Sequence, residues 1–479
     1  MNEDGWLNLT DQGKSPPVPD VCNPTILGRA GTGAVLSLDA IGLQDTYLIS
    51  NPTSNTDTSN ISSSFFQFKN IQHTNFTKYS TSVEFTSDGS PNWPFGQVYR
   101  ISLKPKEMGD ILHNVYLKCT LPPIPQIVTK HQYCNDIGWA IIKEIQLSLD
   151  DTILEIIKCD WNVLYTELHY TKEEKEIIKE MINVDPINGG NLYIPLNFFF
   201  NRRHSSSYTG NSLIRGDNIF KPGLLTCAAH KHRQIILTFT FNPISFFTSA
   251  PSVSMSNVYL VTDEIILEDR ERQFLQNNTQ KNMVSFARND PITPIKGTPF
   301  THSLTPNISV KTLHWFARNS VYEDTSNSYY FNNRFNFTNR DYQLPFSTTN
   351  TMQQQESNNP IISQSIIYLN GVALLGLAKP TTVRDIRDGS YYYKFIQPSN
   401  HSLTVPTKNI YTYSFCVKPR DPQPSGSLDF SQMNSTTTFI TGSLYTYAST
   451  SINWNFYVFY TGYNQITYSN GLVSLDFGW

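Results

Sequence analysis

Two histidines separated by one lysine, His230 and His232, are the first residues whose type and spacing suggest chemistry. Residues two apart in a strand point to the same face, so the two imidazoles could begin a metal site. Metal-binding β-barrels with this spacing add a glutamate a few residues further on, but RQIIL at 233–237 contains none. We therefore expect two histidines that are exposed or contact a partner, with no bound metal.

A glycine-rich stretch, GRAGTG at Gly28–Gly33, has the composition of a phosphate-binding loop. Such a loop continues with Lys-Ser or Lys-Thr and then opens a helix. Here the following residues, AVLSLDAIG, lack that pair and read as a strand. The stretch is therefore predicted to be a turn before a strand, with no cofactor.

Neighbouring carboxylates that could supply a general acid and a general base occur at Asp150-Asp151, at Glu173-Glu174, and at Asp269 with Glu271. Adjacent residues on a strand or a helix point apart, so these pairs make poor acid–base couples. The sequence contains no GxSxG, HExxH or EF-hand motif. We expect no enzyme activity and assign no catalytic, cofactor-binding or metal-binding residue. A glycosidase whose carboxylates lie far apart in the sequence stays open.

The cysteines and the N-terminus indicate the compartment. The six cysteines are at least 15 residues apart, so they form no CxxC pair, and we expect mostly buried thiols: Cys22, Cys119, Cys134, Cys159, Cys227 and Cys416. The start, MNEDGWLNL, lacks the basic and apolar regions of a secretory signal. The longest apolar stretch, near Gly371–Ala378, is too short to span a bilayer. These features predict a soluble protein made in a reducing compartment.

The composition excludes several classes of protein. The chain has 479 residues, which favours two large domains or about three smaller ones. Charged residues make up 16% and aromatic residues 13%, whereas disordered chains are rich in charge and poor in aromatics. The net charge of −3 argues against nucleic acid as the main partner.

Hydrophobic residues alternate with a period of two along much of the chain. Clear examples are VYRISL at 98–103, IIKEIQLSLD at 141–150, QIILTFTF at 234–241, Tyr411–Val417 and Trp454–Tyr460. Turn clusters rich in Pro, Gly, Asn and Ser separate these runs. The pattern predicts an all-β protein built from antiparallel sandwiches.

Two short segments break this pattern with helical features. Thr171 and Glu174 have capping-box spacing, and the apolar residues after them recur at helical intervals until Asp185-Pro186. We expect this segment to be a structural insertion that covers a sheet end. A second helix is predicted at Glu268–Gln276, where a connector between two domains would lie. The polar stretch Ser347–Asn359 is expected to be a surface loop.

Ordered motifs along the chain resemble the major capsid proteins of the nucleocytoplasmic large DNA viruses. The matching segments are QDTYLISNP at Gln44–Pro52, HTNF at His73–Phe76, GDILHNVYLKCTLP at Gly109–Pro122, Ile137–Leu154, LYIPLNFFFNR at Leu192–Arg202, Ile410–Ile440 and Tyr463–Leu475. The chain departs from the family pattern at NIQHTNF, Asn70–Phe76, where a basic stretch is usual, and at the insertion Thr53–Ser63.

The resemblance implies two tandem eight-stranded antiparallel jelly rolls with short helical insertions. The expected organisation is an extended N-terminal arm at 1–26, a first jelly roll at 27–267 with a helical insertion at about 160–183, a connector helix at 268–282, and a second jelly roll at 283–479. A double jelly roll agrees with the strand periodicity.

The resemblance also implies a function. The chain is expected to form homotrimeric capsomers of pseudo-hexagonal outline that tile the icosahedral shell of a large double-stranded DNA virus. Implied partners are neighbouring capsomers, minor capsid and penton proteins, and the internal virion membrane through adaptor proteins, with no direct contact to nucleic acid. The expected location is the virion, after synthesis and assembly in the host cytoplasm or virus factory.

Two alternatives stay open from the sequence. One is a minor capsid or scaffold paralogue with the same fold, and the other is a carbohydrate-binding or carbohydrate-cleaving β-sandwich. Trp139 and Trp161 are predicted to be packing anchors and not ligand platforms. The segment Asp421–Gly426 is predicted to be a rigid turn, and replacing Gly426 with valine is expected to lower the yield of folded trimer.

Overall fold

The computed structural model describes residues 76–125, 131–202, 204–206, 218–220, 222–326, 328–338, 360–374, 391–421, 423–445 and 453–477. Residues from Thr77 onward form one compact unit, to which the description of the fold applies. The expected N-terminal arm, the Gly28–Gly33 turn, the motif at Gln44–Pro52 and the loop at Ser347–Asn359 lie outside the described residues.

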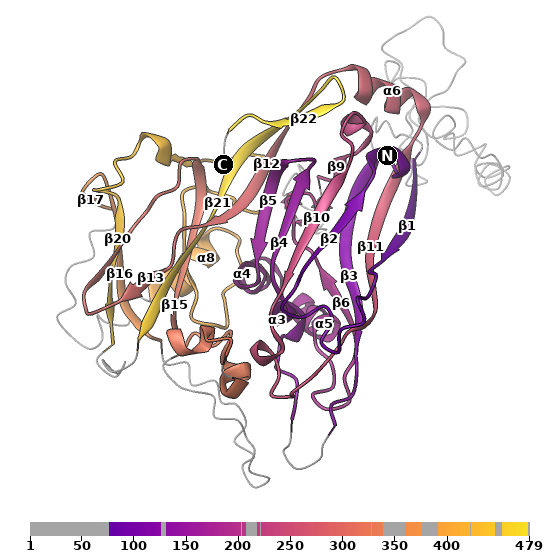
Figure 1. Ribbon diagram of the computed structural model, residues 1–479. Coiled ribbons are helices and arrows are strands. Elements are labelled where there is room, and N and C mark those ends of the chain that lie inside the picture. The colour runs from indigo at the N-terminus through magenta and orange to yellow at the C-terminus, as the bar shows by residue number, and fades with distance from the viewer. Residues whose placement is uncertain are drawn as a thin grey trace, which may run out of the picture. The chain divides into compact units, whose positions relative to one another are not determined.

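The strands of the first half form two antiparallel sheets (Figure 1). One sheet has the order β1-β11-β3-β6, with β9 added beside β3, and the other has the order β2-β10-β4-β5. The bounds are β1 Phe76–Glu84, β2 Val98–Leu103, β3 Ile111–Leu121, β4 Ile142–Leu149, β5 Thr152–Lys158, β6 Gly190–Pro195, β9 Leu224–Leu225, β10 Ile235–Phe241 and β11 Ser256–Leu267; β7 His204–Ser206 and β8 Asn218–Phe220 pair separately.

The second half repeats this arrangement. One sheet has the order β12-β21-β15-β18, with three short strands beside it, and the other has the order β14-β20-β16-β17. The bounds are β12 Gln280–Asn289, β13 Thr293–Ile295, β14 Phe300–Ser303, β15 Ser309–Asn319, β16 Ile362–Leu369, β17 Val372–Ala373, β18 Tyr411–Ser414, β19 Leu428–Asp429, β20 Phe439–Leu444, β21 Trp454–Ser469 and β22 Leu472–Leu475.

Each half is an eight-stranded jelly roll. When the eight principal strands of either half are numbered along the chain, the two sheets read 1-8-3-6 and 2-7-4-5 in both halves. The first and last principal strands are therefore neighbours in both halves, as in a jelly roll. The predicted fold class, two tandem antiparallel jelly rolls with short helical insertions, is confirmed.

The alternating sequence pattern explains why these strands form. In β10 the residues Ile235, Leu237, Phe239 and Phe241 are buried, and the residues between them are partly exposed. Leu237 lies opposite Ile101 of β2 and Leu147 of β4, so the apolar residues of three strands share one face. That face packs inside the first jelly roll.

Strands β15 and β21 differ from β10 because both of their faces are covered. Trp454, Phe456 and Val458 pack in the core of the second jelly roll. Tyr457 and Phe459, on the opposite face of β21, join the cluster formed mainly by the first jelly roll. The sheet β12-β21-β15-β18 is thus enclosed on both sides, which favours long apolar runs over strict alternation.

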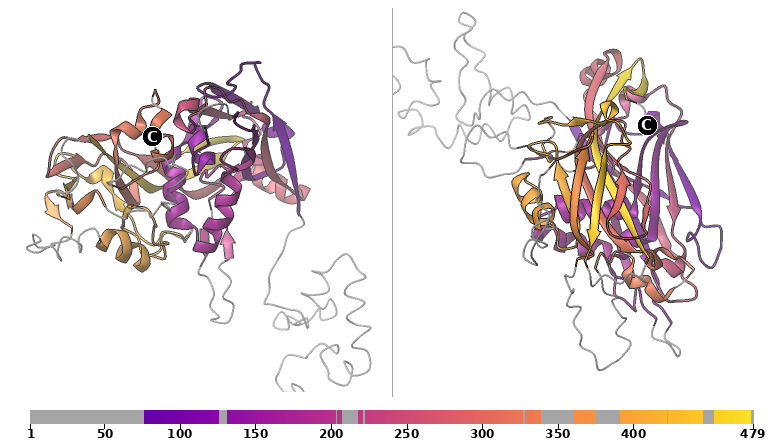
Figure 2. Two further views of the ribbon diagram at one scale, coloured as in Figure 1. Left: turned by 90° about the horizontal axis from the view of Figure 1, so that it is seen from below. Right: turned by 90° about the vertical axis from the view of Figure 1, so that its left-hand side faces the viewer.

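The helices are short and connect strands. Their bounds are α3 Ile137–Ile141, α4 Cys159–His169, α5 Lys172–Ile182, α6 Asp269–Asn277 and α8 Gln397–Asn400; the 3-10 segments are η2 Pro105–Glu107, η3 Cys227–Ala229, η4 Ile244–Phe246, η5 Ser320–Glu323, η6 Ser328–Asn333 and η8 Phe430–Gln432, and the π-helix is η7 Tyr392–Ile396. Helices α4 and α5 follow β5 and precede β6 in the chain, and they lie side by side (Figure 2).

The predicted capping box begins α5. The side chain of Thr171 accepts a hydrogen bond from the Glu174 backbone N–H at 3.3 Å, and the Glu174 carboxylate accepts one from the Thr171 N–H at 3.0 Å. Helix α6 also forms where the sequence predicts it. Arg272 of α6 binds Asp110 at 2.7 Å and Asp269 at 2.7 Å, which ties the helix to the first jelly roll.

The strand predicted over Tyr411–Val417 is shorter than expected. Strand β18 ends at Ser414, although the Phe415 N–H still donates to Lys311 O at 2.8 Å. Beyond Phe415 the backbone folds back, because the Val417 N–H donates to Ser425 O at 3.3 Å and the Lys418 N–H to Ser425 Oγ at 2.8 Å. The chain therefore leaves the sheet after Phe415, and Val417 and Lys418 bind Ser425, a few residues further along the chain, which closes a turn.

Replacing Gly426 with valine is expected to destabilise this turn by about 1–3 kcal/mol. The φ angle of Gly426 is +130°, and a Cβ there would lie 3.1 Å from Phe415 O. Both effects disfavour an L side chain. The thermal unfolding midpoint and the yield of folded protein measure the loss. Gly297→Val is the matched control, because a Cβ at Gly297 meets nothing within 4 Å; equal losses in both variants would contradict the argument.

Candidate functional site at the junction of the two jelly rolls

The two histidines singled out in the sequence lie in a turn, and the expectation that they share a strand face is wrong. Residue 230 follows η3, and its Nδ1 lies 3.0 Å from Cys227 O. His232 accepts from the Val473 N–H at 2.9 Å through Nε2, and its Nδ1 lies 3.0 Å from Asp150 Oδ2. Among the described residues, no group of three His, Cys, Asp or Glu side chains is placed to hold a metal.

The adjacent carboxylates serve turns and helix ends. Asp150 lies between β4 and β5 with φ +49°, and its Oδ1 accepts from the backbone N–H groups of Arg233 and Gln234, both at 3.1 Å. Burial alone would raise the pKa of Asp150, but His232 and these N–H groups outweigh it and hold the pKa below its ordinary value. Glu174 caps α5. Asp150 thus stabilises a turn, and Glu174 stabilises a helix end.

Three other carboxylates, which we call the junction carboxylates, reach from β5 and α4 to the second jelly roll: Glu155, Asp160 and Glu167. None was singled out in the sequence. Their partners lie 132 to 240 residues further along the chain, so local spacing gave no signal for them.

Glu155 is fully buried beside β12. Its Oε1 accepts from the Ala287 N–H at 3.0 Å, and its Oε2 accepts from the Phe199 N–H at 2.8 Å. Arg202 pairs with the same carboxylate at 2.5 Å and also donates to Ser285 O at 2.6 Å. The pair therefore satisfies backbone groups of both jelly rolls in a region without solvent.

Asp160, in the first turn of α4, forms a second buried link. Arg318 of β15 binds its two carboxylate oxygens at 2.6 Å and 3.2 Å, a bidentate arrangement. The same guanidinium donates to Arg334 O at 2.9 Å and to the Tyr457 hydroxyl at 3.0 Å. The side chains of Asp160 and Arg318 are only 10% and 6% exposed, so water screens the pair little.

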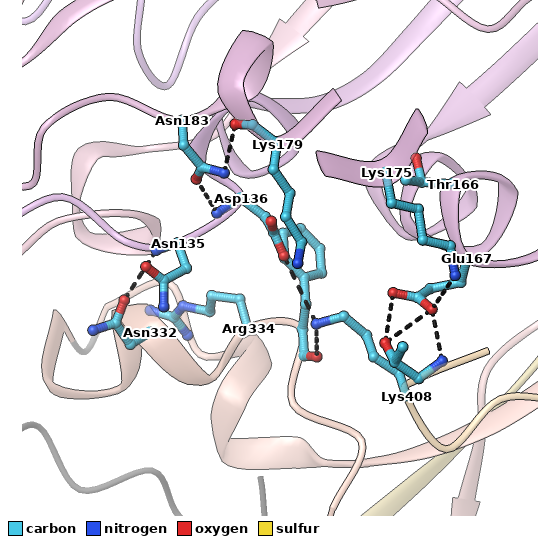
Figure 3. A network of polar contacts seen from close by, with 12 residues as sticks. Asn135, Asp136, Thr166, Glu167, Lys175, Lys179, Asn183, Asn332, Arg334 and Lys408 are labelled. Atoms are coloured by element: carbon cyan, nitrogen blue, oxygen red, sulfur yellow. Dashed lines mark hydrogen bonds and ion pairs between the residues drawn. The ribbon is translucent and has the colours of Figure 1, made fainter. Parts of the chain in front are cut away.

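Glu167 forms the third link near the end of α4 (Figure 3). It pairs with Lys175 of α5 at 3.0 Å and accepts from the Thr407 N–H at 2.8 Å. Burial alone would raise the pKa of Glu167, but Lys175, Lys408 and the Thr407 N–H outweigh it and hold the pKa below its ordinary value. The charged carboxylate thus ties both helices of the insertion to the second jelly roll.

The side chain of Arg334 also links the jelly rolls, and it reaches from the second roll to the first. It belongs to the second half, and its guanidinium donates to Phe246 O at 2.9 Å and to Ser245 O at 3.0 Å in η4 of the first half. It also donates to Tyr322 O at 2.6 Å and lies 4.7 Å from the centre of the Phe246 ring. Arg334 is 1% exposed, which makes it one of the largest fully buried side chains in the described residues.

Aromatic packing surrounds these polar links. Trp161 is 2% exposed and lies between the halves, with ring centroids 6.3 Å from Phe459 and 6.1 Å from His314. The Arg202 guanidinium lies 5.4 Å above the Trp161 ring. Burial, with a smaller effect of Lys311, lowers the pKa of His314 to about 3, so its imidazole is neutral at physiological pH.

Trp139 is buried at 2% exposure, in the same core cluster as Trp161. Both tryptophans thus lie where packing anchors would lie. Their indoles present no open face to solvent.

A cavity of about 270 Å³ opens beside the third link, and we call it the junction cavity (Figure 3). Its wall is drawn from both halves: Cys134, Asn135, Asp136, Lys179, Asn183, Phe331, Asn332, Arg334, Phe335 and Lys408. Burial raises the pKa of the Cys134 thiol, which disfavours its reactive thiolate form.

The geometry of the junction holds two jelly rolls in a fixed relation. The polar links and the shared aromatic core join β5, α4 and η4 of the first roll to β12, β15 and the loop before β18 of the second. No helix in the described part of the chain is long and apolar enough to cross a membrane. Two tandem jelly rolls joined in this way define the chain as a double jelly-roll protein.

Comparison with known families identifies the chain. Residues 64–213 match the family model for the major capsid protein N-terminus, and residues 271–473 match the model for the large eukaryotic DNA virus major capsid protein. The chain belongs to this family of large eukaryotic DNA virus capsid proteins. It is therefore a structural capsid protein and a component of the virion.

Relatives resemble the chain over most of its length, and solved structures share its fold. The major capsid protein of Pyramimonas orientalis virus is 24% identical over 459 residues, covering 91% of this chain and all of the relative. A quasi-atomic model of the PBCV-1 virus capsid matches with a TM-score of 0.64 at 17% identity, covering 87% of this chain and all of that chain. The Faustovirus major capsid protein matches with a TM-score of 0.61 at 10% identity, covering 93% and 98%.

Proposed function

We propose that this chain is the major capsid protein that forms homotrimeric capsomers, and that these capsomers tile the icosahedral shell of a large double-stranded DNA virus. The observation that carries the proposal is the repeated jelly roll with one strand order in both halves. Three chains with two similar rolls each supply six similar wedges, and hence a pseudo-hexagonal outline. A closed ring of three requires one heterologous interface repeated around an axis.

The junction supports this role physically. A tile keeps its outline only if its two rolls cannot move against each other, and the junction carboxylates and Arg334 oppose such movement. Large apolar side chains that a single chain leaves exposed are available for contacts between copies: Phe76, Val98, Ile177, Phe274, Val417 and Phe477.

The remaining assignments follow from this proposal. Neighbouring capsomers, minor capsid proteins and penton proteins would be the partners, with the internal virion membrane reached through adaptor proteins. A net charge of −3 disfavours direct contact with the genome. Assembly would take place in the host cytoplasm or virus factory. We place the arm at 1–26 and the first roll at 27–267. The expected bounds of the connector, 268–282, and of the second roll, 283–479, shift slightly, because the second roll begins with β12 at Gln280.

Light scattering coupled to size exclusion tests the proposal. Three chains of 54.6 kDa should elute as a single species of about 164 kDa. A monomer of 54.6 kDa at micromolar concentration would contradict the trimer. Copy number in purified particles then separates a major capsid protein from a minor paralogue, because the major protein must be the most abundant component.

A further inference from the structure

The junction cavity has an excess of positive charge in its wall. Three of its lining residues are cationic, Lys179, Arg334 and Lys408, and one is acidic, Asp136. Arg334 and Lys408 come from the second jelly roll, and Lys179 comes from α5 of the insertion. A volume of about 270 Å³ accommodates several waters or one small oxyanion with waters around it.

The two lysines keep donors available. The Lys408 ammonium donates to Phe335 O at 3.2 Å, and it lies 3.8 Å from the Asp136 carboxylate, beyond hydrogen-bond distance. The Lys179 ammonium lies 3.6 Å from Glu176, again beyond that distance. An ammonium group has three N–H donors, so each lysine can still donate to a ligand. Figure 3 shows both side chains extending toward Asp136.

We propose that the junction cavity binds a phosphate group, held between Lys179 of the helical insertion and Lys408 of the second jelly roll. Charge-assisted N–H to oxygen bonds from two ammonium groups provide the attraction. The fixed positive charge of Arg334 adds to the field in the cavity. Nothing in the capsid assignment requires this ligand, and the proposal stands apart from trimer formation.

Asp136 gives the site a chemical preference. Hydrogen phosphate retains a P–O–H group at neutral pH, which can donate to a carboxylate, whereas sulfate has no proton to donate. The Asp136 carboxylate therefore accepts a hydrogen bond from phosphate but repels sulfate. A site made only of lysines would bind both anions similarly.

Binding would also strengthen the junction. The phosphate would contact the insertion of the first roll and the loop before β18 of the second roll. A ligand that binds only the folded protein raises the unfolding midpoint with concentration. Phosphate would thus act as a removable link between the two rolls.

Isothermal titration calorimetry on the full chain at pH 7 tests the proposal, with sodium phosphate, sodium sulfate and glycerol 2-phosphate at matched ionic strength. We expect saturable binding of phosphate and binding of sulfate that is at least tenfold weaker. Binding of inorganic phosphate supports the site. The ester is mostly a dianion without a P–O–H group at pH 7, so it should bind about as weakly as sulfate, and tighter binding of the ester than of inorganic phosphate would overturn the role of Asp136. Equal binding of phosphate and sulfate, or no binding of phosphate, would overturn the proposal.

Three variants locate the site. Lys179→Met and Lys408→Met should each weaken phosphate binding about tenfold. Lys179 is 56% exposed on a helix, so its variant should fold even if the Lys408 variant does not. Lys104→Met is the matched control, because Lys104 is an exposed lysine outside the cavity wall, paired with Glu107.

Asp136→Asn tests the preference directly. Asn tolerates the left-handed backbone of residue 136, where φ is +55°, so the turn should keep its shape. We expect this variant to bind sulfate about tenfold more tightly than the native chain does. Unchanged discrimination in Asp136→Asn, or unchanged phosphate affinity in Lys179→Met, would contradict the assigned geometry.

Discussion

Replacing Arg318 with methionine is expected to lower the free energy of unfolding by about 3–5 kcal/mol. The substitution removes a bidentate partner and leaves the Asp160 carboxylate, whose side chain is only 10% exposed, without its guanidinium. It also removes the donors to Arg334 O and to the Tyr457 hydroxyl. Urea denaturation followed by tryptophan fluorescence measures the loss, because Trp161 lies at the same junction.

A double variant separates the effect of lost packing from the effect of the unpaired Asp160 carboxylate. Removing both charges, as in Arg318→Met with Asp160→Leu, should recover about 2 kcal/mol relative to Arg318→Met alone. Lys104→Met is the surface control. It breaks an ion pair whose side chains are more than 60% exposed, and it should change stability by less than about 1 kcal/mol. Losses of similar size for Lys104 and Arg318 would refute the importance of the buried pair.

Truncating Trp161 to alanine should destabilise the protein by a comparable amount, about 3–5 kcal/mol. The indole is 2% exposed and packs against Phe459 and His314 of the second roll. Its removal would leave a cavity that these rings cannot fill without backbone movement. The thermal unfolding midpoint of the purified chain reports the effect.

Trp161→Phe is the matched variant for this prediction. The indole Nε1 has no hydrogen-bond partner in the described structure, so phenylalanine loses volume but no hydrogen bond. We expect a loss well below that of the alanine variant. Phe274→Ala, at a side chain 60% exposed on α6, should have little effect on the isolated chain. If Trp161→Ala behaved like Phe274→Ala, the ring would not be a packing anchor.

Much of the fold was predictable because its signals are local. Alternation alone located β2, β4 and β10, and capping-box spacing located the start of α5. The β21 segment was predicted from Trp454 and the alternate residues after it. The aromatic residues between them, Tyr457 and Phe459, signal a strand covered on both faces, because each face meets a different core.

The junction could not be predicted in the same way. Glu155 lies in a strand whose pattern does not distinguish a buried carboxylate from a solvated one, and its partner Ala287 is 132 residues away. Arg202 offered the nearest signal, since only Asn201 separates it from a run of buried aromatic residues that ends at Phe200. The prediction that the two histidines share a strand face is wrong because residues 230–232 form a turn, in which side chains two apart do not point the same way as in a strand.

The pairing of first and last strands in each roll has a consequence for synthesis on the ribosome. In the second roll Gln280 pairs with Tyr468, so its sheet cannot close until almost the entire chain has been translated. Contacts between such distant residues slow folding, and the waiting nascent strands expose unpaired edges. The first roll, complete once β11 emerges, can close earlier and present β5 and α4 as a preformed surface. The second roll would then fold against its finished neighbour, which makes the order of translation part of how the tile is built.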